Sequence, residues 1–425
     1  MKVLIIANGD FFSNYGGGQA YVRNEVDEMI LQGRHIAVLS FREGVQEIES
    51  LVYKGIPLYQ APAHNTTLLQ ELITKIAPSL LHVHAQKAAM VSIARELRIP
   101  VVVTAHHGGI LCPAGALLND QDQLCACQAS HHHCLRCVLH AVPGGDIAAG
   151  LLQHVPIPLY LKTGRLLQRW PAIPFITPML TTAQVIASRQ AAWQVIARWA
   201  HRVIAPSHAM GEAMLRNGLP ASKMVVLPHG IPLTQAASPP SQRTTPHFCY
   251  VGRICHEKGL HVLLRAFSGL PEQCRLFIAG DSANRTEARY HQKLKRRYAN
   301  DARIQWLGKC SPKQVQALLA RTDVLVHPTI CLEVFGLNIA EALSAGRPVI
   351  ATRCGGAEMQ ITHGQNGWLV PPNDAAALQA AMEALCRHPA QVAQASLLAP
   401  RQVTSIGQHV ADLYNHVFNQ LPDIL

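Results

Sequence analysis

Residues 324–352, "VLVHPTICLEVFGLNIAEALSAGRPVIAT", decide the fold of this chain. The stretch begins with a short apolar run, continues through a glycine at 336 into a segment with apolar residues at helical spacing, and ends in a second run, "PVIAT". Strand, helix and strand in this order predict two parallel strands joined by a crossover helix. The polar residues after the first strand should therefore lie at the carboxyl edge of a sheet, where ligands bind in such folds.

The same pattern recurs in both halves of the chain. In the first half, "KVLIIAN" is followed by glycines at 16–18 and by a helical segment that closes at Gly33, and further apolar runs follow in "HIAVLSF", "LLHVHA", "VVVTAHH" and "RVIAPS". In the second half, "FCYVGRI", "RLFIAGDS" and "IQWLGK" alternate with helical segments before the stretch quoted above. Both halves are therefore predicted to be α/β domains with a doubly wound parallel sheet.

The length and a change in composition set the domain organisation. A chain of 425 residues is too long for one ordinary core and suits two domains of about 200 residues each. A stretch rich in proline, serine and threonine marks the boundary between them. We predict an N-terminal domain (1–231), a linker (232–246), a C-terminal domain (247–400) and a final helical segment (401–425) that packs back on the N-terminal domain. The two domains should face a central cleft.

Two glutamates, Glu333 and Glu341, belong to the loop and helix of the deciding stretch. A rise of about 1.5 Å per residue places them about 12 Å apart or less, which is close to the span of a sugar diphosphate from hexose to ribose. Each carboxylate can accept two hydrogen bonds from vicinal hydroxyls, and Gly336 would let the first helical N–H groups approach phosphates. The alternative is that Glu341 is an exposed helix residue and Glu333 only stabilises the helix dipole.

A pair of cations follows the apolar run "FCYVG". Arg253 and Lys258, in "GRICHEKG", stand between a predicted strand and a helix that opens near Gly259. A guanidinium that binds two oxygens, an ammonium that binds a third and the free N–H groups of a helix N-terminus together form a site for a diphosphate. The alternative is that both cations are ordinary surface charges.

These motifs resemble those of the retaining GT-B glycosyltransferases of family 4. "EVFGLNIAEALSAGRPVIAT", with "VGRICHEKG" before it and "CGGAEMQITHGQNGWLVPPND" after it, is similar to the donor-binding half of that family. The first half of the chain also resembles it, in "YGGGQAYVRNEVDEMILQG", "VVVTAHHG", "RVIAPSHAMGEAML" and "VVLPHGI". The resemblance covers most of the chain and implies the GT-B fold, with two Rossmann-like domains.

The resemblance also implies roles for individual residues. Glu333 would contact the donor sugar, Glu341 the ribose, and Arg253 and Lys258 the diphosphate. His106 would lie near the hexose, the alternative being that it is a satisfied core histidine. Gly17 and Gly18 would lie against the donor phosphates or the acceptor. The other residues that the resemblance places at the donor are Gly280, Phe335, Gly336, Leu337 and Glu358.

Two departures from the family pattern concern the donor pocket. Val334 stands where the family more often has glycine, so it could crowd the sugar. The run "AGDS" lacks a second glycine after Gly280, which leaves the shape of the nucleobase loop open. Glu358 could also be an ordinary acid at a helix N-terminus.

The reaction implied by the resemblance is transfer of a hexosyl group from a nucleoside diphosphate sugar to a hydroxyl, with retained anomeric configuration. Stabilisation of the leaving phosphate carries much of the catalysis in that family, which agrees with a site made of two cations and a helix N-terminus. We expect no cofactor or divalent metal to be required for catalysis. The alternatives are a nucleotide-sugar epimerase of the same fold, a transferase with a soluble acceptor, and a non-catalytic nucleotide-sugar sensor.

A cysteine-rich insertion at about 108–140 lies outside this account. It contains three consecutive histidines and five cysteines, which are Cys112, Cys125, Cys127, Cys134 and Cys137. C-x-C followed by C-x-x-C has the spacing of a zinc knuckle, and four thiolates would satisfy a structural zinc ion. Free thiols and disulfides are the alternatives. We expect the insertion to shape the acceptor site rather than to perform chemistry.

The charge distribution predicts the partners of the chain. The formal net charge is +11, and no acidic residue occurs from Ile147 to Gly211. The basic and tryptophan residues interleaved there with apolar runs are Lys162, Arg165, Arg169, Arg189, Arg198, Arg202, Trp170, Trp193 and Trp199. This pattern is typical of a surface that lies on anionic lipid, although a solvated basic helix face is the alternative. No nucleic-acid-binding motif is found, so nucleic acid is not an expected partner.

The apolar runs are too short for a membrane span or a signal peptide, and this determines the expected localisation. No uncharged apolar run reaches the roughly 20 residues of a membrane span, and the first run is too short for a signal peptide. We therefore expect a cytoplasmic protein with mostly reduced cysteines, peripheral at the inner membrane. Its expected partners are a nucleotide-sugar donor and a lipid-linked saccharide acceptor of envelope or exopolysaccharide biosynthesis.

Overall fold

The computed structural model describes residues 1–7, 9, 11–12, 16–140, 142, 144–167, 176–233 and 243–421. The chain divides into two compact units. Unit 1 comprises Met1–Gln121, Cys125–Gly230 and Ile406–Leu425, and unit 2 comprises Asp122–Leu124 and Ile231–Ser405. The chain thus passes between units beside the boundary predicted at 231 and 232. Much of the predicted linker, 234–242, lies outside the described residues.

Unit 1 is built on an eight-stranded sheet in the order β3-β4-β2-β1-β5-β6-β7-β8. The strands are β1 (Val3–Ile6), β2 (Ile36–Phe41), β3 (Glu49–Tyr53), β4 (Ile56–Ala61), β5 (Leu80–Val83), β6 (Val101–Thr104), β7 (Arg202–Ala205) and β8 (Met224–Val226). All neighbouring pairs are parallel except β3 and β4. That pair is a hairpin because Lys54 and Gly55 have φ values of 47° and 87°, which suit a two-residue turn. The parallel sheet predicted from the sequence is confirmed, with an antiparallel edge.

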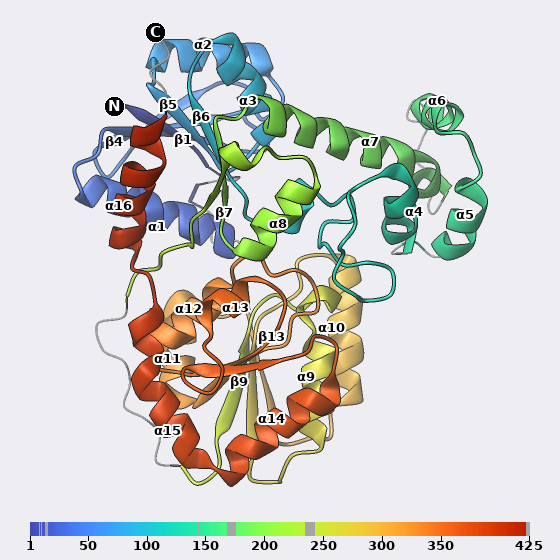
Figure 1. The fold of residues 1–425 in the computed structure, drawn as a ribbon, viewed down its shortest axis with the longest axis vertical. Helices are drawn as coiled ribbons and strands as arrows, with labels where there is room; N and C mark the ends of the chain where they lie inside the picture. Colours follow the sequence, from blue (N-terminus) through green and yellow to red (C-terminus); the bar gives the residue numbers. More distant parts are fainter. Residues whose placement is uncertain are drawn as a thin grey trace. The chain divides into compact units, whose positions relative to one another are not determined.

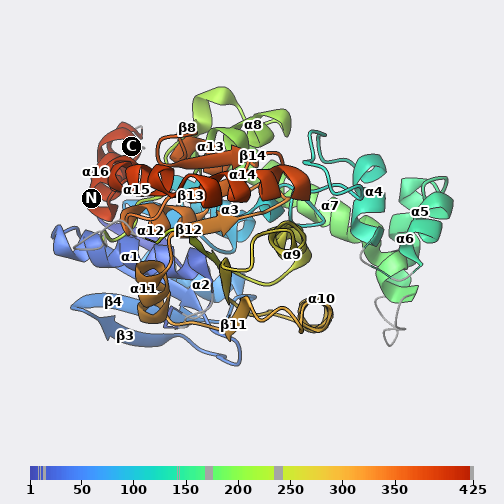
Figure 2. The same cartoon turned by 90° about the horizontal axis from the view of Figure 1, so that it is seen from below.

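Unit 1 contains nine α-helices in the described residues. They are α1 (Gly17–Leu31), α2 (Thr66–Ile76), α3 (Lys87–Glu96), α4 (His131–His140), α5 (Gly145–Leu152), α6 (Ile157–Leu167), α7 (Ile176–Trp199), α8 (His208–Arg216) and α16 (Ile406–His416). Helix α1 packs against α16, and α3 packs against α2 and α7. Helices α4, α5 and α6 gather at one end of α7, away from the sheet (Figures 1 and 2), around Leu139, Tyr160 and Ile186.

Unit 2 has a six-stranded parallel sheet in the order β11-β10-β9-β12-β13-β14. The strands are β9 (His247–Val251), β10 (Arg275–Ala279), β11 (Ile304–Gly308), β12 (Val324–His327), β13 (Val349–Thr352) and β14 (Gly367–Val370). The helices are α9 (Leu260–Ser268), α10 (Arg285–Arg297), α11 (Pro312–Arg321), α12 (Leu337–Ser344), α13 (Gly356–Gln360), α14 (Ala375–Arg387) and α15 (Pro389–Leu398). Helices α11 and α12 lie on one side of the sheet and α9 and α10 on the other (Figure 1). This doubly wound arrangement confirms the predicted fold class.

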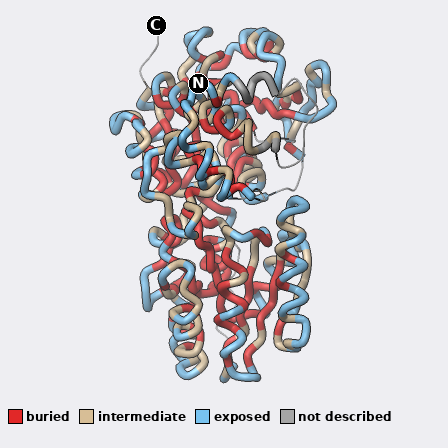
Figure 3. Tube along the Cα trace, turned by 90° about the vertical axis from the view of Figure 1, so that its right-hand side faces the viewer, coloured by how far each residue is buried: buried red, intermediate tan, exposed pale blue. Residues whose placement is uncertain are grey.

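Apolar burial and helix capping explain these elements. Central strands such as β1 and β12 are buried along their whole length, whereas the flanking helices alternate between buried and exposed residues (Figure 3). Helix α11 begins with Pro312, and Ser311 and Gln314 form a capping box before it. Helix α12 begins after Gly336, whose φ of 87° favours glycine. The strand–helix–strand prediction for residues 324–352 is therefore confirmed.

Candidate functional site

The candidate site in unit 2 begins at the carboxyl ends of β9 and β12, which are neighbours in the parallel sheet. Gly252 and Arg253 follow β9, and Glu333 lies in the loop after β12. A tight turn at Gly259 connects these loops: its φ is 67°, and a Cβ there would lie 1.9 Å from the carbonyl oxygen of Pro328. Only glycine permits this approach, which brings Lys258 next to the loop after β12.

Lys258 and Glu333 form an ion pair in this loop. The Lys258 Nζ lies 2.5 Å from the Glu333 Oε2, which is also 3.0 Å from His327 Nε2. Burial by itself would raise the pKa of Glu333, but the Lys258 ammonium and His327 hold it well below its usual range. Burial by itself would lower the pKa of Lys258, and Glu333 instead raises it. Both groups are therefore charged at neutral pH.

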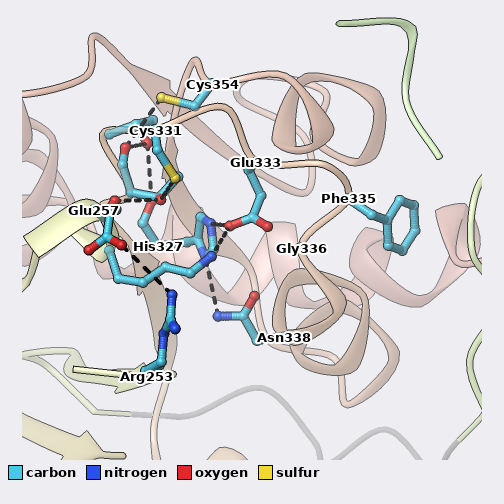
Figure 4. A network of polar contacts seen from close by, with 12 residues as sticks. Arg253, Glu257, His327, Cys331, Glu333, Phe335, Gly336, Asn338 and Cys354 are labelled. Atoms are coloured by element: carbon cyan, nitrogen blue, oxygen red, sulfur yellow. Dashed lines mark hydrogen bonds and ion pairs between the residues drawn. The ribbon is translucent and has the colours of Figure 1, made fainter. Parts of the chain in front are cut away.

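His327 and Asn338 orient the Glu333 carboxylate. The Asn338 Nδ2 lies 2.7 Å from the carbonyl oxygen of Val251 and 3.1 Å from His327 Nδ1. Because Asn338 donates to Nδ1 of the imidazole, Nε2 carries the proton and donates to Glu333. Figure 4 shows His327 between Glu333 and Asn338. Neither His327 nor Asn338 was predicted as a site residue from the sequence.

Arg253 occupies a different electrostatic environment from Lys258. Its guanidinium lies 3.3 Å from Glu287 Oε1 and 3.8 Å from Glu257 Oε1, and its side chain is 50% exposed. Burial would lower the pKa of Arg253, but Cys255 and the two carboxylates raise it. The structure therefore places both predicted cations after β9, with their charged ends on different carboxylates.

The N-terminus of α12 lies next to Glu333. Gly336 precedes the helix, Leu337 is its first residue, and no side chain caps its first N–H groups. Phe335 is buried, and a Cβ on Gly356 would lie 2.4 Å from its carbonyl oxygen. The backbone of Glu333 also bonds to the next loop, accepting from Gly356 N–H at 2.7 Å. The loops after β12 and β13 are thereby fixed against each other beside open N–H donors.

The two other predicted acids of unit 2 are both exposed. Glu341 lies on α12, so its carboxylate is accessible to solvent. Glu358 is exposed, and its Oε2 accepts a hydrogen bond from Gly355 N–H at 2.9 Å. Glu358 therefore acts as a cap of α13, as the alternative interpretation of this residue expected.

Gly280 ends β10 in a tightly packed turn. A Cβ at this position would lie 1.8 Å from the carbonyl oxygen of Gly252, and the Gly280 N–H donates to Gly308 at 2.8 Å. Any side chain at 280 would push the loop that carries Arg253 away from the sheet. The second glycine that "AGDS" lacks is thus not needed to close this turn.

The predicted residues of unit 1 lie at the carboxyl ends of β1 and β6. Gly17 and Gly18 open α1 after Gly16, whose φ is 83°, and the first turn of the helix contains no acidic residue. His106 follows β6, and its Nε2 lies 2.8 Å from His84 Nδ1. Burial lowers the pKa of His106 well below its usual range. His106 is therefore a neutral, hydrogen-bonded and partly buried histidine.

The five cysteines of the insertion are free thiols in the structure. Cys112 is buried and Cys127 is exposed, and burial raises the pKa of Cys134 to about 12. In the described part of the chain, these cysteines do not form a group of three or more metal-ligand atoms within 4.8 Å of one another. The thiols would have to approach one another to bind zinc, so the zinc knuckle stays a prediction.

Helix α4 of the insertion packs with α5, α6 and α7 of the basic stretch. Lys162 is exposed on α6, and Trp193 is buried on α7, where its Nε1 donates to Asn217 at 2.7 Å. Arg169 and Trp170 lie outside the described residues. In the part of the chain that the structure describes, no helix combines the length and apolar character needed to cross a bilayer.

Two protein-family models match adjacent parts of the chain. Residues 234–396 match the model of glycosyl transferases group 1, and residues 151–235 match that of glycosyltransferase family 4. The glycogen synthase of Mycobacterium tuberculosis (strain CDC 1551 / Oshkosh) is 32% identical over 174 residues, which are 38% of this chain and 39% of that protein. The chain thus spans about two fifths of the length of this relative.

Solved structures extend the likeness to the whole fold. The structure of HepE from Anabaena in complex with UDP and glucose matches with a TM-score of 0.67 at 19% identity, over 99% of this chain and 100% of that one. The lipopolysaccharide outer core galactosyltransferase WaaB matches with a TM-score of 0.64 at 16% identity, over 99% and 100% of the two chains. With the two sheets described above, these structural matches show that the chain has the GT-B fold. The two family models together match residues 151–396, more than half of the chain, and show that it belongs to the group 1 glycosyltransferases.

Proposed function

We propose that this chain is a retaining glycosyltransferase that moves a hexosyl group from a nucleoside diphosphate sugar to a hydroxyl group of a saccharide. The observation that carries the proposal is the meeting of Lys258, Glu333 and the open N-terminus of α12 at the carboxyl edge of the unit 2 sheet. An ammonium and free N–H groups suit a diphosphate, and a carboxylate suits sugar hydroxyls. The complex of Anabaena HepE with UDP and glucose supports this class of donor.

The proposed chemistry uses these groups at the bond that breaks. When the bond between the anomeric carbon and the diphosphate oxygen breaks, negative charge grows on the leaving diphosphate. Lys258, Arg253 and the first N–H groups of α12 would stabilise that charge. Glu333 would accept hydrogen bonds from the sugar, and Glu341 from the ribose. We propose that the cations neutralise the diphosphate sufficiently for transfer to require no divalent metal or other cofactor.

The proposed acceptor is a lipid-linked saccharide of envelope or exopolysaccharide biosynthesis, held at the inner face of the membrane. The acid-free stretch from Ile147 to Gly211 supports it, as does the similarity of the fold to a lipopolysaccharide galactosyltransferase. Unit 1 also has an open cavity of about 570 Å³ with no acidic side chain in its lining. Its basic lining residues are Arg95, Arg98, Arg198, His201, Arg202 and Lys223. Such a surface suits anionic headgroups or diphosphates.

The test starts with a panel of nucleoside diphosphate sugars in a thermal-shift assay. A donor at about 100 times its dissociation constant should add about 2.7 kcal/mol of stability. Transfer is then measured with lipid-linked and with soluble acceptors, and the configuration of the product is determined by nuclear magnetic resonance. We expect a retained configuration and product only when an acceptor is present.

Three other outcomes of these assays would change or overturn the proposed function. Conversion of the donor sugar without an acceptor would identify a nucleotide-sugar epimerase. Transfer to soluble acceptors alone would remove the lipid-linked acceptor from the proposal. Failure of every nucleoside diphosphate sugar to stabilise the folded protein would overturn the proposed function as a whole.

A further inference from the structure

A buried group of one carboxylate and two imidazoles lies inside unit 1, apart from the proposed chemistry. Glu25 extends from α1, His82 lies in β5, and His84 follows that strand. The three side chains are fully buried. Residues 82 and 84 are two apart along a strand, so their side chains leave the same face of the sheet, toward α1. This group was not predicted from the sequence.

Three ligand atoms converge at one point in this group. The Glu25 Oε1 lies 3.2 Å from His82 Nδ1 and 3.4 Å from His84 Nε2, and the three atoms lie within 4.8 Å of one another. Zinc bonds to imidazole nitrogen and carboxylate oxygen at about 2.0–2.2 Å, so two ligands of a tetrahedral ion are separated by about 3.3–3.6 Å. The observed separations are close to that value.

The contacts of Glu25 with the two imidazoles are poorly aligned for hydrogen bonds. They are ion pairs at 3.2 and 3.4 Å. Glu25 Oε1, His82 Nδ1 and His84 Nε2 are all buried without a hydrogen-bond partner. The ion pairs of Glu25 in the described structure are all with histidines. One buried carboxylate oxygen and two buried imidazole nitrogens thus face one another without an aligned hydrogen bond.

The opposite atoms of the same three groups are well bonded. His82 Nε2 lies 2.8 Å from Thr104 Oγ1, and His84 Nδ1 lies 2.8 Å from His106 Nε2. Glu25 Oε2 accepts a hydrogen bond from the Tyr21 hydroxyl. Metal ligands in proteins are held in this way, with the atom that faces away from the ion bonded to a second group that fixes the ring and its tautomer.

We propose that Glu25, His82 and His84 bind a divalent transition-metal ion of the zinc class within unit 1. Two imidazoles and one carboxylate are donors that suit zinc and similar ions better than magnesium or calcium. Three protein ligands leave one position of a tetrahedral ion to water or another group. The ion would join α1 to β5 and compensate the buried charge of Glu25. Its role is structural and does not depend on the proposed transfer reaction.

The first test separates this site from the cysteine-rich insertion. A variant in which Cys125, Cys127, Cys134 and Cys137 are all replaced by serine is purified without chelator, incubated with zinc chloride and desalted. We expect about one equivalent of zinc by elemental analysis, bound by nitrogen and oxygen donors. A folded variant that retains no zinc would overturn the proposal.

The second test uses the ligands themselves. In this four-serine variant, His84→Asn and Glu25→Gln should each abolish the retained zinc, whereas His132→Asn, at an exposed histidine of α4, should leave it unchanged. Circular dichroism checks that each variant is folded. Zinc content that is unchanged in folded His84→Asn would show that the ion binds elsewhere and would overturn the assignment.

A spectroscopic measurement covers the case in which those variants do not fold. The four-serine variant, stripped of metal and with Glu25, His82 and His84 intact, is titrated with cobalt chloride, which reports the donors of a tetrahedral site by its absorption. We expect bands of cobalt bound to nitrogen and oxygen, without the intense charge-transfer band of a thiolate ligand. Cobalt spectra dominated by thiolate charge transfer, or no cobalt binding, would contradict the proposed ligands.

Discussion

The carboxylate of Glu333 is ionised although its side chain is only 12% exposed, and this combination determines what a substitution there does. Its charge depends on the Lys258 ammonium at 2.5 Å and on the His327 N–H at 3.0 Å. If the charge of Glu333 is removed, the Lys258 ammonium can still bind a diphosphate. Removing the cation leaves a carboxylate that has lost its main partner. Substitutions of Glu333 and of Lys258 should therefore have different effects on transfer and on diphosphate binding.

Glu333→Gln should lower transfer by about 10²-fold and leave the affinity for the free nucleoside diphosphate nearly unchanged, because the lost contact is to the sugar. Turnover assays and calorimetric titration with the nucleoside diphosphate check this expectation. Glu272→Gln is the matched control, since Glu272 is exposed in the loop between α9 and β10. A loss of nucleoside diphosphate affinity as large as the loss of transfer would reject the sugar contact.

Lys258→Met should lower turnover by about 10² to 10³-fold, because the diphosphate loses one of the groups that stabilise its charge. The control is Lys313→Met at an exposed position of α11. Normal turnover in Lys258→Met would show that this ammonium serves only to pair with Glu333.

The ion pair also predicts a dependence of stability on pH. The folded-state pKa of Glu333 is depressed, so its contribution is present above the unfolded pKa of about 4.3 and is lost as the pH falls below it. The free energy of unfolding should therefore decrease on acidification below about pH 4.3, and less steeply in Lys258→Met. Urea denaturation between pH 3 and about pH 7 measures both slopes. Equal slopes in the two proteins would contradict the assigned pKa shift.

At the scale of elements, the position of Lys258 depends on the turn between β9 and α9. Gly259 combines a φ of 67° with a backbone approach of the kind that only glycine allows. This turn also receives a hydrogen bond from the loop after β12, where Ile330 N–H donates to the Glu257 carbonyl at 2.9 Å. Contacts between the loops after β9 and β12, which are far apart in sequence, thus fix the geometry of the Lys258–Glu333 ion pair.

Gly259→Ala should destabilise the fold more than Gly44→Ala. Both substitutions place a side chain at positive φ, at a cost of about 1–2 kcal/mol, but only the Cβ at 259 would collide with the backbone, because no atom lies within 4 Å at 44. We expect a further loss of at least similar size for Gly259→Ala, measured by urea denaturation. Equal destabilisation of the two variants would show that the Pro328 carbonyl can move aside.

Most elements could be predicted from the sequence because their apolar runs are buried on both faces or carry clear end signals. The segment "PKQVQALLAR" coincides with α11, and "PVIAT" contains β13. The antiparallel β3 edge was missed, since its strand is largely exposed and lacks a buried run. The hairpin signal at Lys54-Gly55 could have identified it.

The candidate site could be predicted only where the motif lies on one continuous stretch. Lys258 and Glu333 were found by spacing and resemblance, whereas His327 reads as the end of a strand and Asn338 as a helix residue. The buried group of Glu25, His82 and His84 was not predicted, because Glu25 lies more than fifty residues before the two histidines in the sequence. The alternation "HVH" in β5 was the available signal, since it places two histidines on one face of a strand.

At the scale of the whole molecule, the charge distribution predicts reversible membrane binding. We expect the protein to cosediment with anionic vesicles at low salt and to be released at high salt, because each basic residue near the surface contributes about 1 kcal/mol. Replacing Lys162, Arg165 and Arg169 by glutamine should weaken the binding. Neutral vesicles should not bind the protein.

The control for net charge removes the same number of cations from unit 2. Arg289, Lys293 and Arg296 are exposed on α10, and their replacement by glutamine should leave vesicle binding nearly unchanged. Equal weakening in the two triple variants would mean that overall charge, rather than the acid-free stretch, attracts the protein to lipid. No binding to anionic vesicles would favour a soluble acceptor.

The return of the chain to unit 1 has a consequence for biosynthesis. Helix α16 contributes Val410 and Leu413, both fully buried, and its His409 bonds to the Pro228 carbonyl at 2.7 Å. The ribosome makes these residues only after all of unit 2. The continuous segment Ile231–Ser405 can therefore fold during translation, while unit 1, although it begins first, must wait with an apolar face of α1 uncovered. Chaperones would be expected to meet the nascent N-terminal half rather than the C-terminal one.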